Sequence, residues 1–155
     1  MNKRLSLMVT VITLVTLSAV AAAANPVLSV ELSGHGSWVF TQPASGLVVL
    51  ELAADIPISF TWSGDASAYG GEVVGYRYGW DLVDPGDPND PGWTSAGFVP
   101  DLQVSSPMTF SSGIHRLHIV AMDDAGSTTE AGFHLVIVES VSNRTSTWSA
   151  LKRRF

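Results

Sequence analysis

The chain of 155 residues contains no cysteine. Disulfide bonds, thiolate catalysis and cysteine-ligated metal sites are therefore excluded, and a folded domain must be stabilised by packing, with a bound metal as the one further aid. Basic residues are scarce between residues 25 and 140, where all 14 acidic residues of the chain stand beside only two arginines. We expect no nucleic-acid surface on this body, because phosphate binding requires a basic field.

Long apolar runs are also missing, except for one near the N-terminus. Two basic residues precede an apolar run at residues 5–20, and four alanines follow it. This order is typical of a secretory signal peptide, so we predict that residues 1–24 are removed after Ala24, with Ala22 or Ala23 as alternative sites. The competing interpretation is an uncleaved anchor, for which the run is barely long enough. Cleavage leaves no stable transmembrane span and a secreted, periplasmic or extracellular protein.

Helical periodicity is absent from the body of the chain, residues 25–140. Short apolar segments broken by Gly, Pro, Asp and Ser recur there instead, and they indicate an all-β domain. We predict nine strands, at residues 27–32, 37–41, 47–52, 56–62, 73–80, 93–98, 108–110, 114–122 and 128–139. Alternation in three of them predicts the following core-facing side chains: Ile56, Ile58, Phe60 and Trp62; Leu117, Ile119 and Ala121; Phe133, Leu135 and Ile137.

The strand predicted at residues 73–80 has an unusual composition. Val74, Tyr76, Tyr78 and Trp80 share one face by alternation, whereas Arg77 points to the other face. Gly75 and Gly79 also fall on that second face and contribute no side chains to it. We expect the aromatic face to pack against another part of the protein.

Three motifs in this body resemble fibronectin type III and related bacterial immunoglobulin-like modules. ISFTW at residues 58–62 is similar to the second strand of that family, GYRY at 75–78 to the third, and HRLHIVAMDDAG at 115–126 to the sixth strand and its turn, with His115 where the family has a tyrosine. The resemblance implies an antiparallel, immunoglobulin-like β-sandwich of about 7–9 strands over residues 25–140. It implies no particular function, since such sandwiches serve binding, spacing and adhesion alike.

Four aspartates are spaced by three in a loop rich in proline and glycine: Asp81, Asp84, Asp87 and Asp90. Calcium prefers several oxygen ligands, and a tight loop of carboxylates and carbonyls can supply them, so these residues are a candidate calcium site. The spacing differs from that of an EF-hand. The alternative is that each aspartate caps a bend in a solvated loop.

Aromatic residues concentrate around the same loop. Exposed aromatic rings stack on the faces of sugars in carbohydrate-binding sandwiches, so Tyr78, Trp80 and Trp93 are candidate ligand-binding residues. Core packing is the competing interpretation for each of them.

The C-terminal tail, residues 141–155, differs in composition from the body because it is basic. Trp148, Leu151 and Phe155 fall on one face if the tail is helical, which makes them candidate contacts for a partner or a membrane surface. A frayed terminus lying on the acidic domain is the alternative.

No serine, histidine and aspartate grouping supports nucleophilic catalysis, so we expect no enzyme. The sequence favours a secreted binding or adhesion module whose partner is a protein or glycan at the cell surface. Two alternatives remain open: a structural or spacer subunit attached through the tail, and a carbohydrate-binding module. No cofactor is expected other than the calcium ion considered above.

Overall fold

The computed structural model describes residues 24–43 and 46–139. The predicted signal peptide, apart from its last residue, lies outside the described residues, as does the tail with Trp148, Leu151 and Phe155. Within the described ranges, no helix has the length and the hydropathy that crossing a membrane requires.

The described residues form seven strands and one short 3-10 helix. The strands are β1 (Val27–Leu32), β2 (Gly36–Phe40), β3 (Leu47–Ala53), β4 (Phe60–Asp65), β5 (Val73–Trp80), β6 (Gly113–Asp123) and β7 (Thr128–Val138), and the helix is η1 (Ser67–Tyr69). The protein is therefore all-β, as its sequence predicts. Strands β1 and β5 have the predicted bounds.

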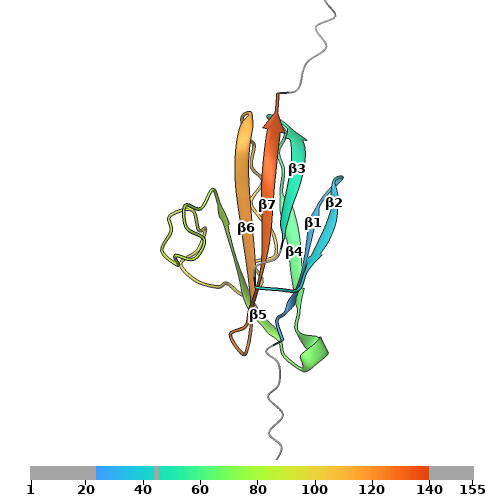
Figure 1. Ribbon diagram of the computed structural model, residues 1–155, viewed down its shortest axis with the longest axis vertical. Helices are drawn as coiled ribbons and strands as arrows, with labels where there is room; N and C mark the ends of the chain where they lie inside the picture. Colours follow the sequence, from blue (N-terminus) through green and yellow to red (C-terminus); the bar gives the residue numbers. More distant parts are fainter. Residues whose placement is uncertain (1–23, 44–45, 140–155) are drawn as a thin grey trace, which may run out of the picture.

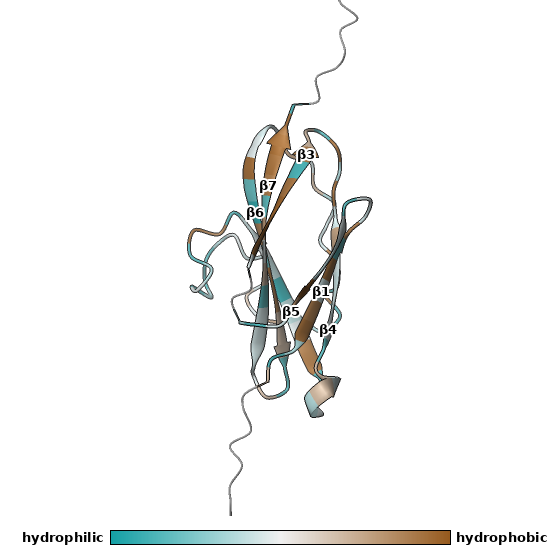
Figure 2. Ribbon diagram, turned by 45° about the vertical axis from the view of Figure 1, so that its right-hand side comes forward, coloured by the Kyte–Doolittle hydropathy of each residue, from teal (hydrophilic) through white to brown (hydrophobic). Residues whose placement is uncertain are grey.

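The strands are arranged in two sheets, one with the order β2-β1-β4 and the other with the order β3-β7-β6-β5. The two sheets lie as separate layers in Figure 1, and in Figure 2 apolar residues colour much of β1 and β7 brown. Strand β3 pairs with β7 in parallel, whereas the other paired strands are antiparallel. The expectation of an entirely antiparallel sandwich is wrong at this pair, because an alternating pattern fixes the faces of a strand but not its direction.

Two predicted strands are absent, and a third begins later than predicted. Residues 93–98 and 108–110 form only single bridges, Gly79 with Trp93 and Ile58 with Met108, and β4 begins at Phe60 rather than at residue 56. Proline explains part of this difference, because residues 57, 100 and 107 are prolines, which have no N–H to donate to a ladder.

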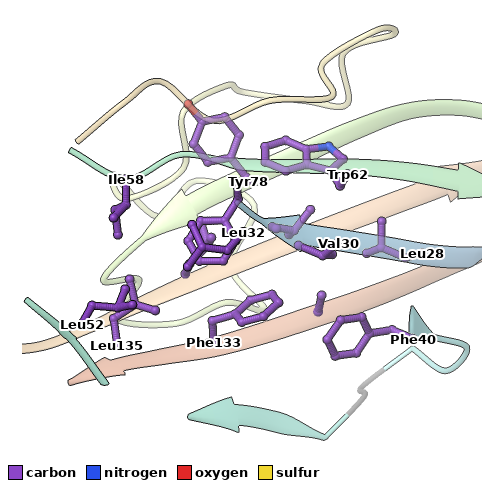
Figure 3. Close-up of a cluster of buried hydrophobic side chains, with 14 of the residues drawn as sticks. Leu28, Val30, Leu32, Phe40, Leu52, Ile58, Trp62, Tyr78, Phe133 and Leu135 are labelled. Atoms are coloured by element: carbon purple, nitrogen blue, oxygen red, sulfur yellow. The ribbon is translucent and has the colours of Figure 1, made fainter. Parts of the chain in front are cut away.

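One hydrophobic core fills the space between the sheets (Figure 3). Phe133 of β7 is fully buried, and its ring lies 5.8 Å from that of Phe40 and 5.1 Å from that of Phe60. The predicted core faces are confirmed on β6 and β7 and from Ile58 to Trp62, but Ile56 is 55% exposed because it precedes the strand.

The aromatic face of β5 is confirmed for Tyr76 and Tyr78, which are both buried in this core. Val74 departs from it and is 39% exposed. The register of β5 shifts between Val73 and Gly75, and such a bulge interrupts the alternation of side chains.

Candidate functional site

A long loop covers the free edge of β5. We call residues 81–99 the edge loop; in Figure 1 it projects to the side of the sheet that contains β5 and β6. Its far end returns along β5, where Trp80 N donates to Gly92 O at 3.1 Å and Thr94 N donates to Tyr78 O at 3.0 Å. Further along, Val99 exchanges two backbone hydrogen bonds with Tyr76. The loop thus occupies an edge that would otherwise be open to pairing with another chain.

Two glycines allow the loop to lie this close to the strand. A Cβ atom at Gly79 would lie 2.7 Å from the carbonyl oxygen of Gly92, and a Cβ atom at Gly92 would lie 2.6 Å from the carbonyl oxygen of Trp80. Both distances are shorter than real carbon–oxygen contacts. Glycine is therefore required at both positions for the loop to dock as it does.

Asp90 holds the middle of the edge loop together. Its carboxylate accepts hydrogen bonds from the backbone N–H groups of Asp84, Val83 and Gly92, at 2.8, 2.9 and 2.8 Å. These bonds, that from Asp84 first, hold the pKa of Asp90 below its ordinary value because they favour the charged form. The Asp90 carboxylate thus accepts hydrogen bonds from three backbone N–H groups that would otherwise pair with carbonyl groups of a neighbouring strand.

The other three aspartates of the predicted calcium site also hold backbone in place. Asp84 accepts from Gly86 N at 2.9 Å, and Asp87 accepts from Asn89 N at 2.8 Å, each closing a bend two residues long. Asp81 accepts from the backbone N–H of Arg116 at 2.7 Å. In residues 24–43 and 46–139 no three ionisable side chains lie close enough to share a metal ion, so the structure does not bring the four aspartates together.

The three predicted ligand-binding aromatics do not lie on one surface either. Tyr78 is buried with its ring 5.2 Å from that of Trp62, and the ring of Trp80 packs 4.9 Å from that of Phe110. Both rings therefore point into the sandwich, as core packing would have them. Trp93 comes from the edge loop and lies over the opposite face of β5, where it covers the side chain of Arg77.

Arg77 and Trp93 form a stacked pair on the outer face of the second sheet. The guanidinium carbon of Arg77 lies 3.6 Å from the centre of the Trp93 ring, which is a cation–π geometry. The indole N–H donates to the carbonyl oxygen of Asp87 at 3.0 Å, so the ring is held by the loop as well as by the cation. Arg77 is only 7% exposed.

The guanidinium of Arg77 has no hydrogen-bond acceptor among the described residues. Its buried Nε makes no hydrogen bond there, and none of the ion pairs in that part of the chain includes Arg77. Burial lowers the pKa of Arg77, while the negative charge of Asp87 opposes that shift. Arginine stays charged under such conditions. The pair therefore contains a largely buried cation whose Nε–H is unpaired among the described residues.

A small pocket opens beside this pair. Its volume is ≈ 230 Å³, and the residues that line it include Arg77, Trp93, Pro85, Pro88 and Glu130. The Glu130 carboxylate lies 2.6 Å from Nδ1 of His118. A larger hollow of ≈ 440 Å³ between β2 and β3 has no charged residue in its lining. The pocket at Arg77 thus combines the apolar rings of Trp93, Pro85 and Pro88 with a guanidinium group whose Nε has no hydrogen-bond partner among the described residues.

Sequence reasoning placed Arg77 on the outer face of β5 but did not select it as a site residue. A signal was available, because Arg77 is one of only two arginines in an acidic body and stands on the strand with the most aromatic residues. Its burial depends on Trp93, which lies far along the chain, and no local pattern encodes that contact.

At the other end of β5, Tyr69 and Asp123 tie η1 to the turn between β6 and β7. The Tyr69 hydroxyl donates to Asp123 Oδ2 at 2.7 Å, while Asp123 Oδ1 accepts from Ala125 N and Ser127 N. Burial, together with this hydrogen bond, raises the pKa of Tyr69 to about 12. The hydrogen bond from Tyr69 and those from backbone N–H groups hold the pKa of Asp123 below its ordinary value, against the opposing effect of burial. This group of residues stabilises a turn and has its polar atoms paired.

No protein-family model and no curated protein matches the chain. A solved structure to which it is similar is that of the extracellular domain of a proposed one-component system from B. thetaiotaomicron, with a TM-score of 0.44 and 15% sequence identity. The match covers 77% of this chain and 16% of that chain. The chain therefore spans about a sixth of the length of that structure.

Proposed function

We propose that this protein is exported and acts as a non-enzymatic binding or adhesion module, built as an immunoglobulin-like sandwich of the fibronectin type III kind. The observation that carries the proposal is the edge loop, a long irregular segment whose backbone is fixed on a β-sheet. Loops mounted on a rigid sandwich are where such folds place recognition surfaces. The partner is a protein or a glycan at the cell surface.

The way in which the loop is fixed favours binding over a mere connection. A connection between β5 and β6 needs no more than a few residues, whereas this one uses a carboxylate with three donors and a tryptophan held at both its ring and its N–H. A loop that is ordered before it meets a ligand loses less conformational entropy on binding. The order of the edge loop therefore supports a role in recognition.

The arrangement of the strands supports the immunoglobulin-like assignment. Strands β6 and β7 form a hairpin in one sheet, and β4 lies in the other sheet beside β1. The backbone at Met108 and Val104 bridges to the segment from Ile58 to Thr61, which places a further extended segment along the edge of β4. The parallel pairing of β3 with β7 is the feature that departs from the simple antiparallel pattern.

Two histidine–carboxylate pairs are the candidates for a catalytic acid or base among the described residues. His115 Nδ1 lies 2.9 Å from Asp81 Oδ2, and His118 Nδ1 lies 2.6 Å from Glu130 Oε1. Among the described residues, no serine or threonine hydroxyl makes a hydrogen bond to either imidazole, and catalysis by an activated hydroxyl requires one. This geometry supports a proposal of binding without turnover.

The experiment is a binding survey with mature protein, residues 25–155, on arrays of glycans and extracellular proteins. The variant Asp90→Ala removes the acceptor of three loop N–H groups, and Val39→Ser, at a residue 66% exposed on β2, is the matched control. We expect a saturable ligand whose binding falls in Asp90→Ala and persists in Val39→Ser. A ligand that binds both variants equally would place recognition elsewhere, and the absence of any saturable ligand would refute the binding module.

A further inference from the structure

We propose that the pocket beside Arg77 and Trp93 binds the carboxylate of an acidic sugar, a hexuronate residue of a glycan. This inference rests on the proposed binding function and names the class of ligand that the edge loop takes. It is argued from the unused donors of Arg77, from the charges around them and from the apolar residues that line the same pocket.

The Nε–H donor of Arg77 has no acceptor among the described residues. Arginine carries five N–H donors, and burying them without acceptors is unfavourable unless a partner arrives. Arg77 is 7% exposed, its buried Nε has no hydrogen-bond partner within the described residues, and the residue lines a pocket that opens to solvent. The guanidinium fork matches the two oxygens of a carboxylate and binds them with two parallel hydrogen bonds. An anionic group in this pocket would therefore satisfy donors that the protein leaves free.

The charges around the pocket limit how much negative charge a ligand can carry. Among the described residues, Arg77 is the only arginine or lysine that lines the pocket, Glu130 is also in the lining, and the negative charge of Asp87 acts on Arg77. The carboxylate of Glu130 lies 2.6 Å from Nδ1 of His118, and it adds to the negative charge around the pocket. A dianionic phosphate would meet this negative surrounding with twice the charge of a carboxylate. The balance of charge thus favours a monoanion.

The apolar residues of the pocket indicate what the rest of the ligand is. Trp93, Pro85 and Pro88 give the pocket flat apolar surfaces beside the cation, and sugars present flat C–H faces to such rings. The indole is held in place by its bond to the carbonyl oxygen of Asp87, so the surface exists before the ligand arrives. A volume of ≈ 230 Å³ suits a single ring rather than a larger ligand. An aspartate or glutamate side chain of a peptide would supply the carboxylate but no ring to fill the apolar part.

The test is calorimetric titration of mature protein, residues 25–155, with trimers of galacturonate, glucuronate and mannuronate, and with the methyl ester of each. The ester keeps the shape of the sugar and removes its charge. We expect at least one acid to bind and its ester to bind about 10- to 100-fold more weakly, as the loss of a charged hydrogen-bonded contact implies. This comparison needs no variant, so it holds even if substitutions disturb folding.

Variants then locate the site. Arg77→Gln removes the buried cation, and Arg116→Gln makes the same change of charge at the other, exposed arginine of the body. We expect a loss of about 10- to 100-fold in Arg77→Gln and no change in Arg116→Gln, with thermal melts showing that both are folded. Equal binding of acid and ester, or unchanged binding in folded Arg77→Gln, would overturn the carboxylate contact.

Two further outcomes separate this inference from the function on which it rests. If none of the acidic trimers binds but an array ligand is lost in Asp90→Ala, the acidic-sugar assignment is overturned and the binding module stands. If a peptide rich in aspartate and glutamate binds at Arg77 while the trimers do not, the ligand is a carboxylate without a sugar ring, and the assignment is overturned in favour of an acidic protein partner. If no array ligand binds at all, the proposed function itself has failed.

Discussion

The contact between Gly79 and the edge loop allows a quantitative test of how the loop is held. In Gly79→Ala the new Cβ would lie 2.7 Å from Gly92 O, 2.9 Å from a Leu82 methyl carbon and 3.0 Å from the ring of Trp93. The two side chains can move, but the carbonyl oxygen of Gly92 accepts the 3.1 Å hydrogen bond from Trp80 N. The substitution must therefore either strain β5 or lift the loop from the strand.

The expected magnitude follows from a comparison with Gly97→Ala. A Cβ atom at Gly97 has no neighbour within 4 Å, so this variant only reduces the entropy of the unfolded chain and stabilises the protein by about 0.4–1 kcal/mol. Gly79→Ala gains the same entropy term but loses about 1–3 kcal/mol to overpacking. The difference between the two variants isolates the overpacking, and at roughly 4 °C per kcal/mol for a domain of this size it lowers Tm by about 4–12 °C.

Thermal melts of the two variants, followed by circular dichroism under identical conditions, measure this difference directly. Near-ultraviolet spectra at low temperature report in addition whether the Trp93 ring keeps its environment in Gly79→Ala. If the two variants melt together, the loop is not docked on β5 as described, and the proposal that it forms a fixed recognition surface loses its support.

Four other predictions concern the core, the turn, the metal and export. Phe133→Ala should lower the free energy of unfolding by about 3–5 kcal/mol, measured by urea titration, because it empties a fully buried ring position. Asp123→Asn should flatten the acid limb of stability, because the lowered folded-state pKa of Asp123 gives a contribution that is complete above the ordinary value of 3.8 and is lost as pH falls through the lowered value. Thermal melts of the variant and the wild type should therefore differ most above pH 3.8 and least at pH values below the lowered pKa. Melts in EDTA and in millimolar calcium should coincide, because the loop carboxylates already accept backbone N–H groups; a calcium-dependent rise abolished by Asp84→Asn with Asp87→Asn would reinstate the calcium site. N-terminal sequencing of the exported protein should begin at Asn25, and retention of residues 1–24 would indicate the anchor instead.

The fold was predictable where one face of a strand is buried over its whole length. Leu117, Ile119 and Ala121 on β6 alternate with half-buried or exposed positions, and the structure buries all three completely. The edges of the sheets were harder to predict. Strand β3 is recognisable as a strand, but its parallel pairing with β7 depends on how the chain passes between sheets, which no periodic pattern records.

The candidate site was less predictable than the fold, for a related physical reason. Alternation correctly placed Arg77 opposite the aromatic face of β5, and the composition of the loop drew attention to Trp93. Alternation also placed Tyr78 and Trp80 on one face, and that face proved to be the core. The stacking of Trp93 on Arg77 joins residues that are distant in the chain, and it exists only because two glycines let the loop approach the strand.

The charge of the body gives the pocket at Arg77 a further property. An acidic domain repels an anionic glycan at long range, and this repulsion falls away within about 10 Å at moderate salt. The contact with Arg77 lies at short range and is partly buried, so salt screens it much less. Added salt should therefore speed association without greatly weakening the bound state, which is the reverse of the behaviour of a basic surface that attracts polyanions. A site of this kind selects a carboxylate by local geometry and not by the field of the whole protein, and that is the form of selectivity that a single buried arginine in an acidic domain can provide.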